Sequence, residues 1–345
     1  MNPRNGLVPT LLLALQPVAS PPTPADADAR TQEYRYLMGT SVSVEAFGGD
    51  ALTRRAAIAE AFAAVAEVDR LMSNYRDDSE LALVNRRAAQ EPVRVSDPMM
   101  SVLQAAQEVS ARSEGAFDVT VGPLVRLWGF HDRKPHVPTP AELEKVRSLI
   151  GYRNLVLDPG PHTVRFRRDG VELDLGGIAK GFAVELAAGV LRRHGLAGFI
   201  DAGGNQFLVG HPPGKTTWTL GIKNPDTPDR LLGVLDLTEG SVSTSAQYAN
   251  SLATGSRQYG HLLDPRTMQP SEGALSVTVV SPDGTLADAL SKVGFLLGPV
   301  KGLAVIESFP GSAAVIAFRK PGGTIGVAVS SRLAGRYHPA PAARP

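Results

Sequence analysis

Residues 171–184, VELDLGGIAKGFAV, combine a short apolar run, a Gly-Gly pair and the beginning of a helical pattern. The apolar run predicts a strand that delivers Asp174 to a turn at Gly176 and Gly177. The apolar spacing over residues 178–194 predicts that a helix follows directly. A strand, a tight turn and the start of a helix are therefore expected within one short segment.

This turn has the features of a phosphate-binding site. Glycines let backbone amides and carbonyls come close to a ligand. The start of a helix offers unpaired N–H groups and a positive dipole end, and Lys180 in its first turn can reach a phosphate oxygen. A Gly-Gly turn alone could equally serve helix packing. We favour ligand binding because an aspartate, three glycines and a lysine fall within residues 174–181.

Helical and strand patterns interleave irregularly on both sides of this segment. Alternating apolar residues predict strands, and apolar residues at helical spacing predict helices. The main elements expected are strands at residues 41–47 and 275–280, and helices at residues 53–72, from Asp97, from Thr139 and from Thr285. This order lacks clean βαβ units, which favours one globular α+β domain over a doubly wound parallel sheet.

Composition excludes several classes of protein. The 345 residues are 43% hydrophobic and 20% charged, which is enough to build a sizeable core. The formal net charge is +1 and no Lys/Arg run is longer than two, so a nucleic-acid-binding face is not expected. The sequence contains no cysteine, which excludes disulfides, thiolate catalysis and cysteine-bound metal.

The two ends of the chain differ from the globular region. Residues 7–15, LVPTLLLAL, follow a weakly basic start and precede small residues, as in a secretory signal. We expect residues 1–30 to be a signal peptide and Pro/Ala-rich linker, residues 31–336 the domain, and residues 337–345 a disordered tail. This pattern favours a periplasmic or secreted location, with anchoring at the inner membrane if the signal stays uncleaved. A disordered leader is the alternative.

Two segments carry side chains suited to catalysis or metal binding. His261 precedes a turn at Asp264-Pro265, and a histidine there can act as a general base near neutral pH. Asp288 lies in the first turn of a predicted helix, where a carboxylate can bind Mg²⁺. Both also have ordinary structural explanations. A lone histidine is often only a hydrogen-bond partner, and an aspartate at a helix N-terminus complements the helix dipole.

Two turns add further polar candidates. In residues 199–210, FIDAGGNQFLVG, two apolar strands flank Asp201 to Asn205, which predicts a hairpin with polar side chains beside its glycines. In residues 73–86, SNYRDDSELALVNR, Tyr75 could stack on an aromatic ligand. A plain hairpin and a capped loop are the simpler interpretations of these two segments.

In chain order, these segments resemble the FAD:protein FMN transferase family, or ApbE-type flavin transferases. The motifs run from about residue 38 to about residue 330: MGTSVSV, SNYRDDSELALVN, GAFDVTVGPLVRLWGF, ELDLGGIAKGFAV, DAGGNQFLVG, STSAQYAN, YGHLLDPRT and SVTVVSPDGTLADALSKVGFLLG. The resemblance implies a two-lobed α+β domain with FAD in a cleft between the lobes and Mg²⁺ on the FAD pyrophosphate. The implied reaction joins FMN through a phosphoester to a threonine of a target protein, a redox or membrane-associated flavoprotein, and releases AMP.

The resemblance also implies roles for individual residues. His261 would be the base that deprotonates the incoming threonine. The Gly177 carbonyl and Asp288 would hold the metal, with Lys292 at the position of the usual threonine ligand. The residues expected to contact FAD are Met38, Tyr75, Asp118, Asp174, Gly176, Lys180 and Thr244.

The sequence departs from the family pattern at Lys292. Residues four apart on a helix share one face, so Lys292 can reach Asp288. An ammonium about 4 Å from a metal ion would repel it by several kcal/mol at an effective dielectric constant of ~20. Two arrangements are open. Lys292 extends outward and leaves the metal in place, or its ammonium occupies the metal's place and binds phosphate directly.

A second departure lies in the hairpin, where Asp201 and Asn205 look exchanged relative to the family pattern. The exchange moves the negative charge within the turn without changing the net charge.

Two alternatives to transfer also stay open. One is Mg-dependent hydrolysis of FAD to FMN and AMP, and the other is FAD binding in the periplasm without turnover.

Overall fold

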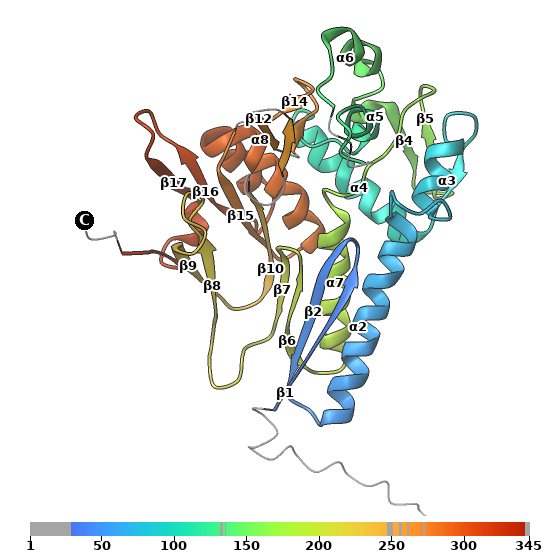
Figure 1. Ribbon diagram of the computed structural model, residues 1–345. Coiled ribbons are helices and arrows are strands. Elements are labelled where there is room, and N and C mark those ends of the chain that lie inside the picture. Colours follow the sequence, from blue (N-terminus) through green and yellow to red (C-terminus); the bar gives the residue numbers. More distant parts are fainter. Residues whose placement is uncertain are drawn as a thin grey trace, which may run out of the picture.

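The computed structural model describes residues 29–131, 134, 136–246, 251–254, 257–260, 262–271 and 273–341, and only the backbone within 251–260. Its largest element is an eight-stranded sheet in which every neighbouring pair is antiparallel (Figure 1). In spatial order the strands are β1 (Arg30–Leu37), β2 (Thr40–Phe47), β6 (Ala197–Ala202), β7 (Asn205–Val209), β10 (Gly240–Ala246), β15 (Ser276–Ser281), β16 (Ala313–Arg319) and β17 (Ile325–Val329). This sheet and its separate helices confirm the predicted α+β class.

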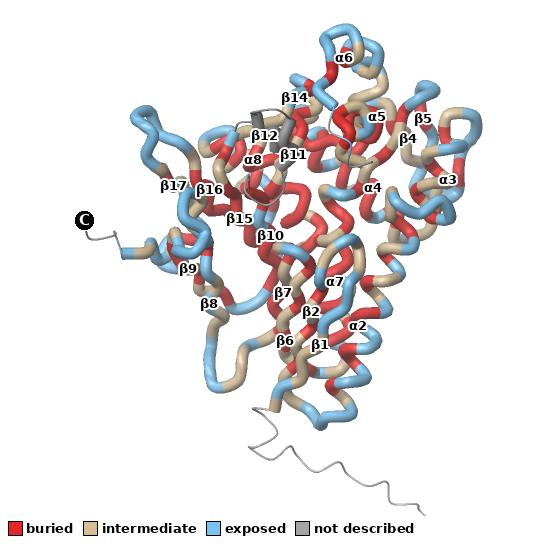
Figure 2. The backbone as a smooth tube through the Cα atoms, in the orientation of Figure 1, coloured by how far each residue is buried: buried red, intermediate tan, exposed pale blue. Residues whose placement is uncertain are grey.

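Three long helices cover one face of the sheet (Figure 1). They are α2 (Ala51–Met72), α7 (Ala179–Arg193) and α8 (Gly284–Ser308). Helix α2 packs against β1 and β2, α7 against β6 and β7, and α8 against β10, β15 and β16. The main hydrophobic core lies in this layer, and Figure 2 shows buried residues gathered where the helices meet the sheet. The two helices that begin nearest the predicted site, α7 and α8, therefore pack on the same face of one sheet.

A smaller sheet packs on the opposite face. Its strands are β8 (Trp218–Lys223), β9 (Leu231–Leu237) and β18 (Tyr337–Pro339). Side chains alternate along a strand, so Val279 of β15 joins the main core while Val280 joins the second cluster with Leu235. Because β18 pairs with β9, the ordered domain extends past the boundary predicted at residue 336, and that boundary is wrong.

The remaining elements gather at one end of the molecule (Figure 1). They are α3 (Glu80–Arg87), α4 (Asp97–Arg112), α5 (Gly122–Leu127) and α6 (Pro140–Arg147), the sheet of β3 (Val93–Arg94), β5 (Thr163–Phe166) and β4 (Leu155–Asp158), and the pairs β11 (Ser251–Thr254) with β12 (Arg257–Gly260) and β13 (Leu263–Asp264) with β14 (Gln269–Pro270). Short 3₁₀ turns lie at Val119–Val121, Tyr152–Asn154 and Ser331–Leu333. Buried Trp128 donates from its indole nitrogen to the Met268 carbonyl at 3.1 Å, which ties the segment after His261 to the end of α5.

Polar caps explain where the helices begin. Asp283 accepts a hydrogen bond from Leu286 N at 2.8 Å at the start of α8, and Thr139 with Glu142 forms a capping box at α6. Helix α4 begins after Ser96, whose hydroxyl caps its first turn. The predicted helices from Asp97, Thr139 and Thr285 are thus confirmed to within one residue.

Helix α8 bends at Gly298, which has a non-helical φ of 72° and precedes Pro299. Among the described residues, α8 is the one helix long and apolar enough to cross a membrane by length and composition. Half of its apolar window is buried inside the protein, as expected of a core helix on a sheet.

The strand predicted before the Gly-Gly turn is wrong, because residues 171–175 form no strand. The side chain of Asn85 takes the place of a strand partner, accepting from Leu173 N at 2.8 Å and donating to Leu173 O at 3.0 Å. Asp174 N then donates to the Val119 carbonyl at 2.8 Å. These contacts hold the approach to the turn in place without a sheet.

Candidate active site

The Gly-Gly turn lies directly before α7. The Asp174 carboxylate accepts a hydrogen bond from Gly176 N at 2.8 Å, and the Lys180 ammonium donates to the Gly176 carbonyl at 3.0 Å. No side chain caps the start of α7 at Ile178. Burial raises the pKa of the Asp174 carboxyl, while the Gly176 amide and the charge of Lys180 oppose the rise. A glycine turn, a helix start and an ammonium group therefore meet in one place.

A cavity of about 330 Å³ opens beside this turn. It is lined by Met38, Gly39, Asp69, Met72, Ser73, Asn74, Tyr75, Arg76, Gly176, Ala179 and Lys180. The wall unites the β1–β2 turn, the loop after α2 and the start of α7, so it brings together four residues expected to contact FAD. A larger depression of about 380 Å³ lies against α4 and β4, and its wall contains none of the predicted site residues.

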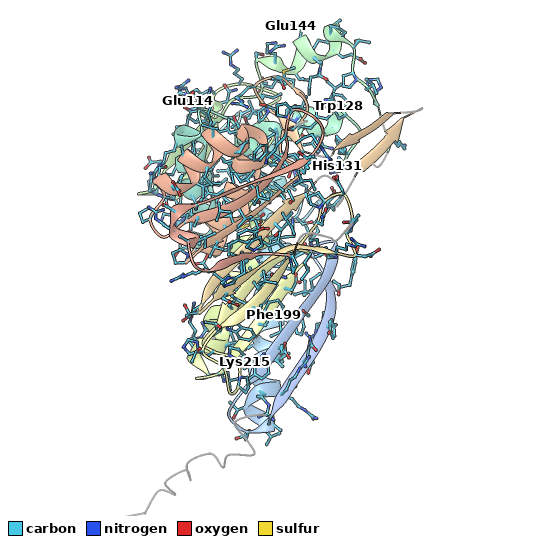
Figure 3. The ribbon with its side chains drawn as sticks, turned by 90° about the vertical axis from the view of Figure 1, so that its left-hand side faces the viewer. Glu114, Trp128, His131, Glu144, Phe199 and Lys215 are labelled. Carbon is cyan, nitrogen blue, oxygen red and sulfur yellow. The ribbon has the colours of Figure 1, made fainter. Side chains whose placement is uncertain are left out.

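Two stacked rings stand at the rim of this cavity. The rings of Tyr75 and His131 are 5.1 Å apart at 21°, and Tyr75 is 76% exposed. His131 Nε2 lies 3.1 Å from the Asn74 carbonyl oxygen. Figure 3 shows His131 close to Trp128 and far from Phe199 and Lys215 at the other end of the molecule. The rim therefore offers an aromatic surface that is open to solvent.

The junction of α7 and α8 buries the predicted metal ligand Asp288. Its Oδ2 accepts from Gly181 N at 2.9 Å, and its side chain has no exposed surface. The helices meet so closely that a Cβ at Gly181 would overlap the Gly284 carbonyl oxygen and lie 2.6 Å from Asp288 Cβ. Glu185 of α7 adds a link by accepting from Gly284 N at 3.0 Å and from the Thr285 hydroxyl at 3.1 Å.

Lys292 follows Asp288 by one turn of α8, and its ammonium forms an ion pair with Asp288 Oδ1. The Lys292 side chain is only 15% exposed. Burial lowers the pKa of Lys292, the charge of Asp288 raises it, and the nearby charge of Lys180 lowers it. A Cβ placed on Gly177 would lie 3.9 Å from Lys292 Cε. The structure thus places Lys292 beside both Gly177 and Asp288.

A chain of buried hydroxyls supports this junction, and none of its members is among the predicted site residues. Ser291 donates to the Asp288 carbonyl at 2.7 Å, and Ser245 lies 2.8 Å from Ser291 Oγ. Ser243 donates to Asn205 Oδ1 at 2.7 Å and contacts Ser291 at 3.3 Å. Alternation along β10 places Ser243 and Ser245 on one face, and this signal in the STSAQYAN motif could have revealed them.

Two residues expected to contact FAD lie elsewhere. The buried Asp118 carboxylate accepts from Thr120 N at 2.8 Å and from the Thr120 hydroxyl at 2.7 Å, and it does not line the cavity. Burial raises the pKa of Asp118, and its hydrogen bonds with Thr120 oppose the rise. Thr244 is exposed, on the face of β10 opposite the buried serines, with its hydroxyl 3.0 Å from that of Thr278.

The exchanged residues of the β6–β7 hairpin both have local partners. Asp201 accepts from Gly204 N at 3.0 Å and from the Gln206 amide at 3.2 Å. Asn205 enters the serine chain through Ser243. The exchange is therefore accommodated by hydrogen bonds within the turn and the sheet.

His261, the predicted base, lies outside the described residues. The described chain on its C-terminal side forms the short β13–β14 pair, where Arg266 binds the Asp264 carboxylate at 2.7 Å. The catalytic role of His261 therefore stays a prediction from the resemblance.

The residues at Asp288 do not fit a magnesium ion in this arrangement. Mg²⁺ binds oxygen ligands, commonly one or two carboxylates with several waters. Here one Asp288 oxygen faces the Gly181 amide and the other faces the Lys292 ammonium. Within the described part of the chain, no three His, Cys, Asp or Glu side chains gather as a metal site.

Comparison with known proteins decides the family. The model of the ApbE family matches residues 38–317. The chain belongs to the ApbE family. A Treponema pallidum relative named FAD:protein FMN transferase is 32% identical over 310 residues, covering 84% of this chain and 86% of that protein. A Klebsiella pneumoniae protein of the same name is 32% identical over 287 residues, covering 81% and 87%.

Solved ApbE structures share the fold. The crystal structure of the ApbE protein from Thermotoga maritima has a TM-score of 0.81 and 30% identity, covering 89% of this chain and 99% of that chain. The flavin transferase ApbE from Vibrio cholerae has a TM-score of 0.80 and 29% identity over the same shares. The single α+β domain is thus an ApbE domain.

Proposed function

We propose that this ApbE-family chain cleaves FAD and transfers FMN through a phosphoester to a threonine of an acceptor protein, with release of AMP. Membership of the family and the names of its relatives support the proposal. The observation that supports it best is that Tyr75, Gly176 and Lys180 line the same cavity. An aromatic ring suits the flavin, and a helix start with an ammonium suits the phosphates.

The reaction is one displacement at phosphorus. The threonine hydroxyl oxygen forms a bond to the FMN phosphorus of FAD, the bond from that phosphorus to the bridging oxygen breaks, and AMP leaves with this oxygen. The hydroxyl proton passes to a base, for which His261 is the candidate. Alignment and charge neutralisation supply most of the catalysis in phosphoryl transfer.

The described residues can bind and orient FAD. Lys180 already lies against the turn and can turn its ammonium to a phosphate oxygen. Tyr75, at the exposed rim, can stack on the flavin, which would place the diphosphate toward the Gly176–Gly177 turn. We place FAD in this cavity, as the occupant of the cleft that the resemblance implies. The resemblance implies magnesium on the FAD diphosphate, but the residues at Asp288 do not fit that ion in this arrangement, and no step of the proposed reaction depends on it.

The acceptor and the location are also proposals. A redox or membrane-associated flavoprotein is the acceptor that the resemblance implies. Residues 7–15 support export to the periplasm or a similar space, with or without cleavage. The mass of the N-terminal peptide from fractionated cells tests this, and a full-length protein confined to the cytosol would contradict it.

The test of transfer uses the full chain, FAD and one purified threonine-bearing acceptor at a time. We expect covalent flavin on the acceptor, seen by in-gel fluorescence, with an equal amount of AMP seen by chromatography. AMP with free FMN would support FAD hydrolysis instead, and tight FAD binding with neither product would support a binding protein.

The matching variant is His261→Ala. Removing a general base should slow FMN transfer by about 10²–10⁴-fold and leave FAD affinity nearly unchanged. Loss of FAD binding in this variant would make His261 structural rather than catalytic.

A further inference from the structure

The ion pair between Asp288 and Lys292 occupies the place where the resemblance implies a divalent cation. Asp288 is fully buried and Lys292 is 15% exposed. The second carboxylate oxygen is held by Gly181 N at 2.9 Å. Both oxygens of the carboxylate therefore have partners that belong to the chain itself.

The backbone keeps this carboxylate where it is. The close approach of Gly181 and Gly284 leaves no room for α8 to turn against α7, so Asp288 stays on the Gly181 amide. Ser291 holds the Asp288 carbonyl from the other side of the same helical turn at 2.7 Å. Lys292 then reaches the carboxylate as its neighbour on one helix face.

The Lys292 stem runs beside the Gly-Gly turn. Its Cε lies 3.9 Å from where a Gly177 Cβ would stand. Lys180 reaches the carbonyl of the preceding glycine, Gly176, at 3.0 Å. Two ammonium groups therefore meet at one turn before a helix, and lysine is a common phosphate-binding residue in such turns.

Resting on the proposed function, we propose that Lys292 is a built-in replacement for the divalent cation. Its ammonium, anchored on Asp288, binds the FAD diphosphate together with Lys180, and the chain binds and cleaves FAD without a metal ion. The site carries one positive charge fewer than the same site with a divalent cation in place of the ammonium. A divalent cation at Asp288 would meet the Lys292 charge at close range, which disfavours its binding.

The first test measures metal and FAD binding in the wild-type chain. Mn²⁺ is titrated into the protein without FAD, and free Mn²⁺ is followed by electron paramagnetic resonance. FAD affinity is measured by flavin fluorescence in EDTA and in Mg²⁺. We expect no stoichiometric Mn²⁺ binding. FAD affinity should differ by less than ~3-fold between EDTA and Mg²⁺, well below the tenfold difference that corresponds to about 1.4 kcal/mol of binding free energy.

The second test compares Lys292→Thr with Lys301→Thr, which changes an exposed lysine on the same helix. Lys292→Thr should gain a Mn²⁺ site, and its FAD affinity should become Mg²⁺-dependent by ~10-fold or more. Lys301→Thr should behave as wild type in both measurements. If Lys292→Thr does not fold, the wild-type measurements decide alone.

The outcomes separate this inference from the proposed function. Stoichiometric Mn²⁺ binding by the wild type, or FAD binding that EDTA weakens ~10-fold, would overturn the replacement alone. Absence of FAD binding in every condition would overturn both. Covalent transfer in EDTA would support both.

Discussion

At the junction of α7 and α8, Asp288 is fully buried and both of its oxygens have partners within the chain. At the rim of the cavity, Tyr75 is 76% exposed and stacks on His131. Polar groups in a buried network are costly to leave unpaired, whereas an exposed ring can change partner at little cost. Substitutions at the junction should therefore reduce stability, and substitutions at the rim should reduce ligand affinity.

The largest effect is expected from Asp288→Ala. It leaves the buried Lys292 ammonium without its partner, so the free energy of unfolding should fall by about 3–5 kcal/mol. Transfer activity should be lost with it. Urea unfolding measures the change, with Asp226→Ala as the control because Asp226 forms an exposed ion pair with Arg319. Equal losses in the two variants would contradict a special role for the junction.

Gly181→Ala tests the contact between the helices. Its Cβ would overlap the Gly284 carbonyl, and such overpacking typically costs about 1–3 kcal/mol of stability. Gly189→Ala in the same helix is the matched control, since its Cβ would meet only Arg193 at 3.8 Å. Removing that helical glycine should stabilise the protein by about 0.5–1 kcal/mol. A tolerated Gly181→Ala would show that the helices can separate.

Asp118→Asn tests a buried carboxyl outside the cavity. Because burial raises the pKa of Asp118, the folded chain keeps this proton to higher pH than the unfolded chain. The wild type therefore loses stability as pH rises from about 4 through the raised pKa, by about 1.4 kcal/mol for each pH unit between the unfolded and folded pKa values. The asparagine variant has no such loss, so its stability relative to wild type should increase over this range. Urea unfolding from pH 3.5 to pH 7 measures it, with the pH limits chosen to bracket the ordinary value of about 3.9.

If the stability of Asp118→Asn relative to wild type instead falls as the pH rises, the result would contradict the argument that burial raises the pKa of Asp118. FAD affinity provides the second readout, because Asp118 does not line the cavity. We expect that affinity to stay unchanged. A weakened affinity would favour the contact with FAD that the resemblance implies.

Tyr75→Ala is expected to have the smallest effect on the fold. Loss of a stacking partner worth about 0.5–1.5 kcal/mol should weaken FAD binding by ~2- to 13-fold. The free energy of unfolding should change by less than about 0.5 kcal/mol, since the ring is exposed. Flavin fluorescence compares it with Tyr75→Phe, which keeps the ring and should bind as wild type. Unchanged FAD affinity in Tyr75→Ala would show that the ring at the rim does not contact the flavin.

Local periodicity accounts for the parts of the site that the sequence predicts. The contact of Asp288 with Lys292 follows from helix geometry alone, and the Gly-Gly turn before α7 follows from glycine and the helical pattern. Both depend on residues close in the chain. The confirmed starts of α4, α6 and α8 likewise depend on capping residues beside the helix.

The unpredicted parts depend on residues far apart in the chain. The Asn85 clamp on Leu173 replaces an expected strand, and no local pattern marks a side chain that comes from α3. The serine chain requires the register of β10 under α8, which places Ser245 against Ser291. Such pairings arise from tertiary packing and cannot be inferred from one segment at a time.

The close contact of Gly181 with Gly284 also bears on the acceptor protein. The backbones of α7 and α8 touch at these two glycines, so the helices have little freedom to move apart, and the site beside them cannot widen to admit a folded surface. The acceptor must therefore be the partner that changes conformation when its threonine enters the site. We expect its threonine to lie on an extended loop or chain end that can reach into a fixed site, and peptides bearing such a threonine should accept FMN where one locked in a central strand does not.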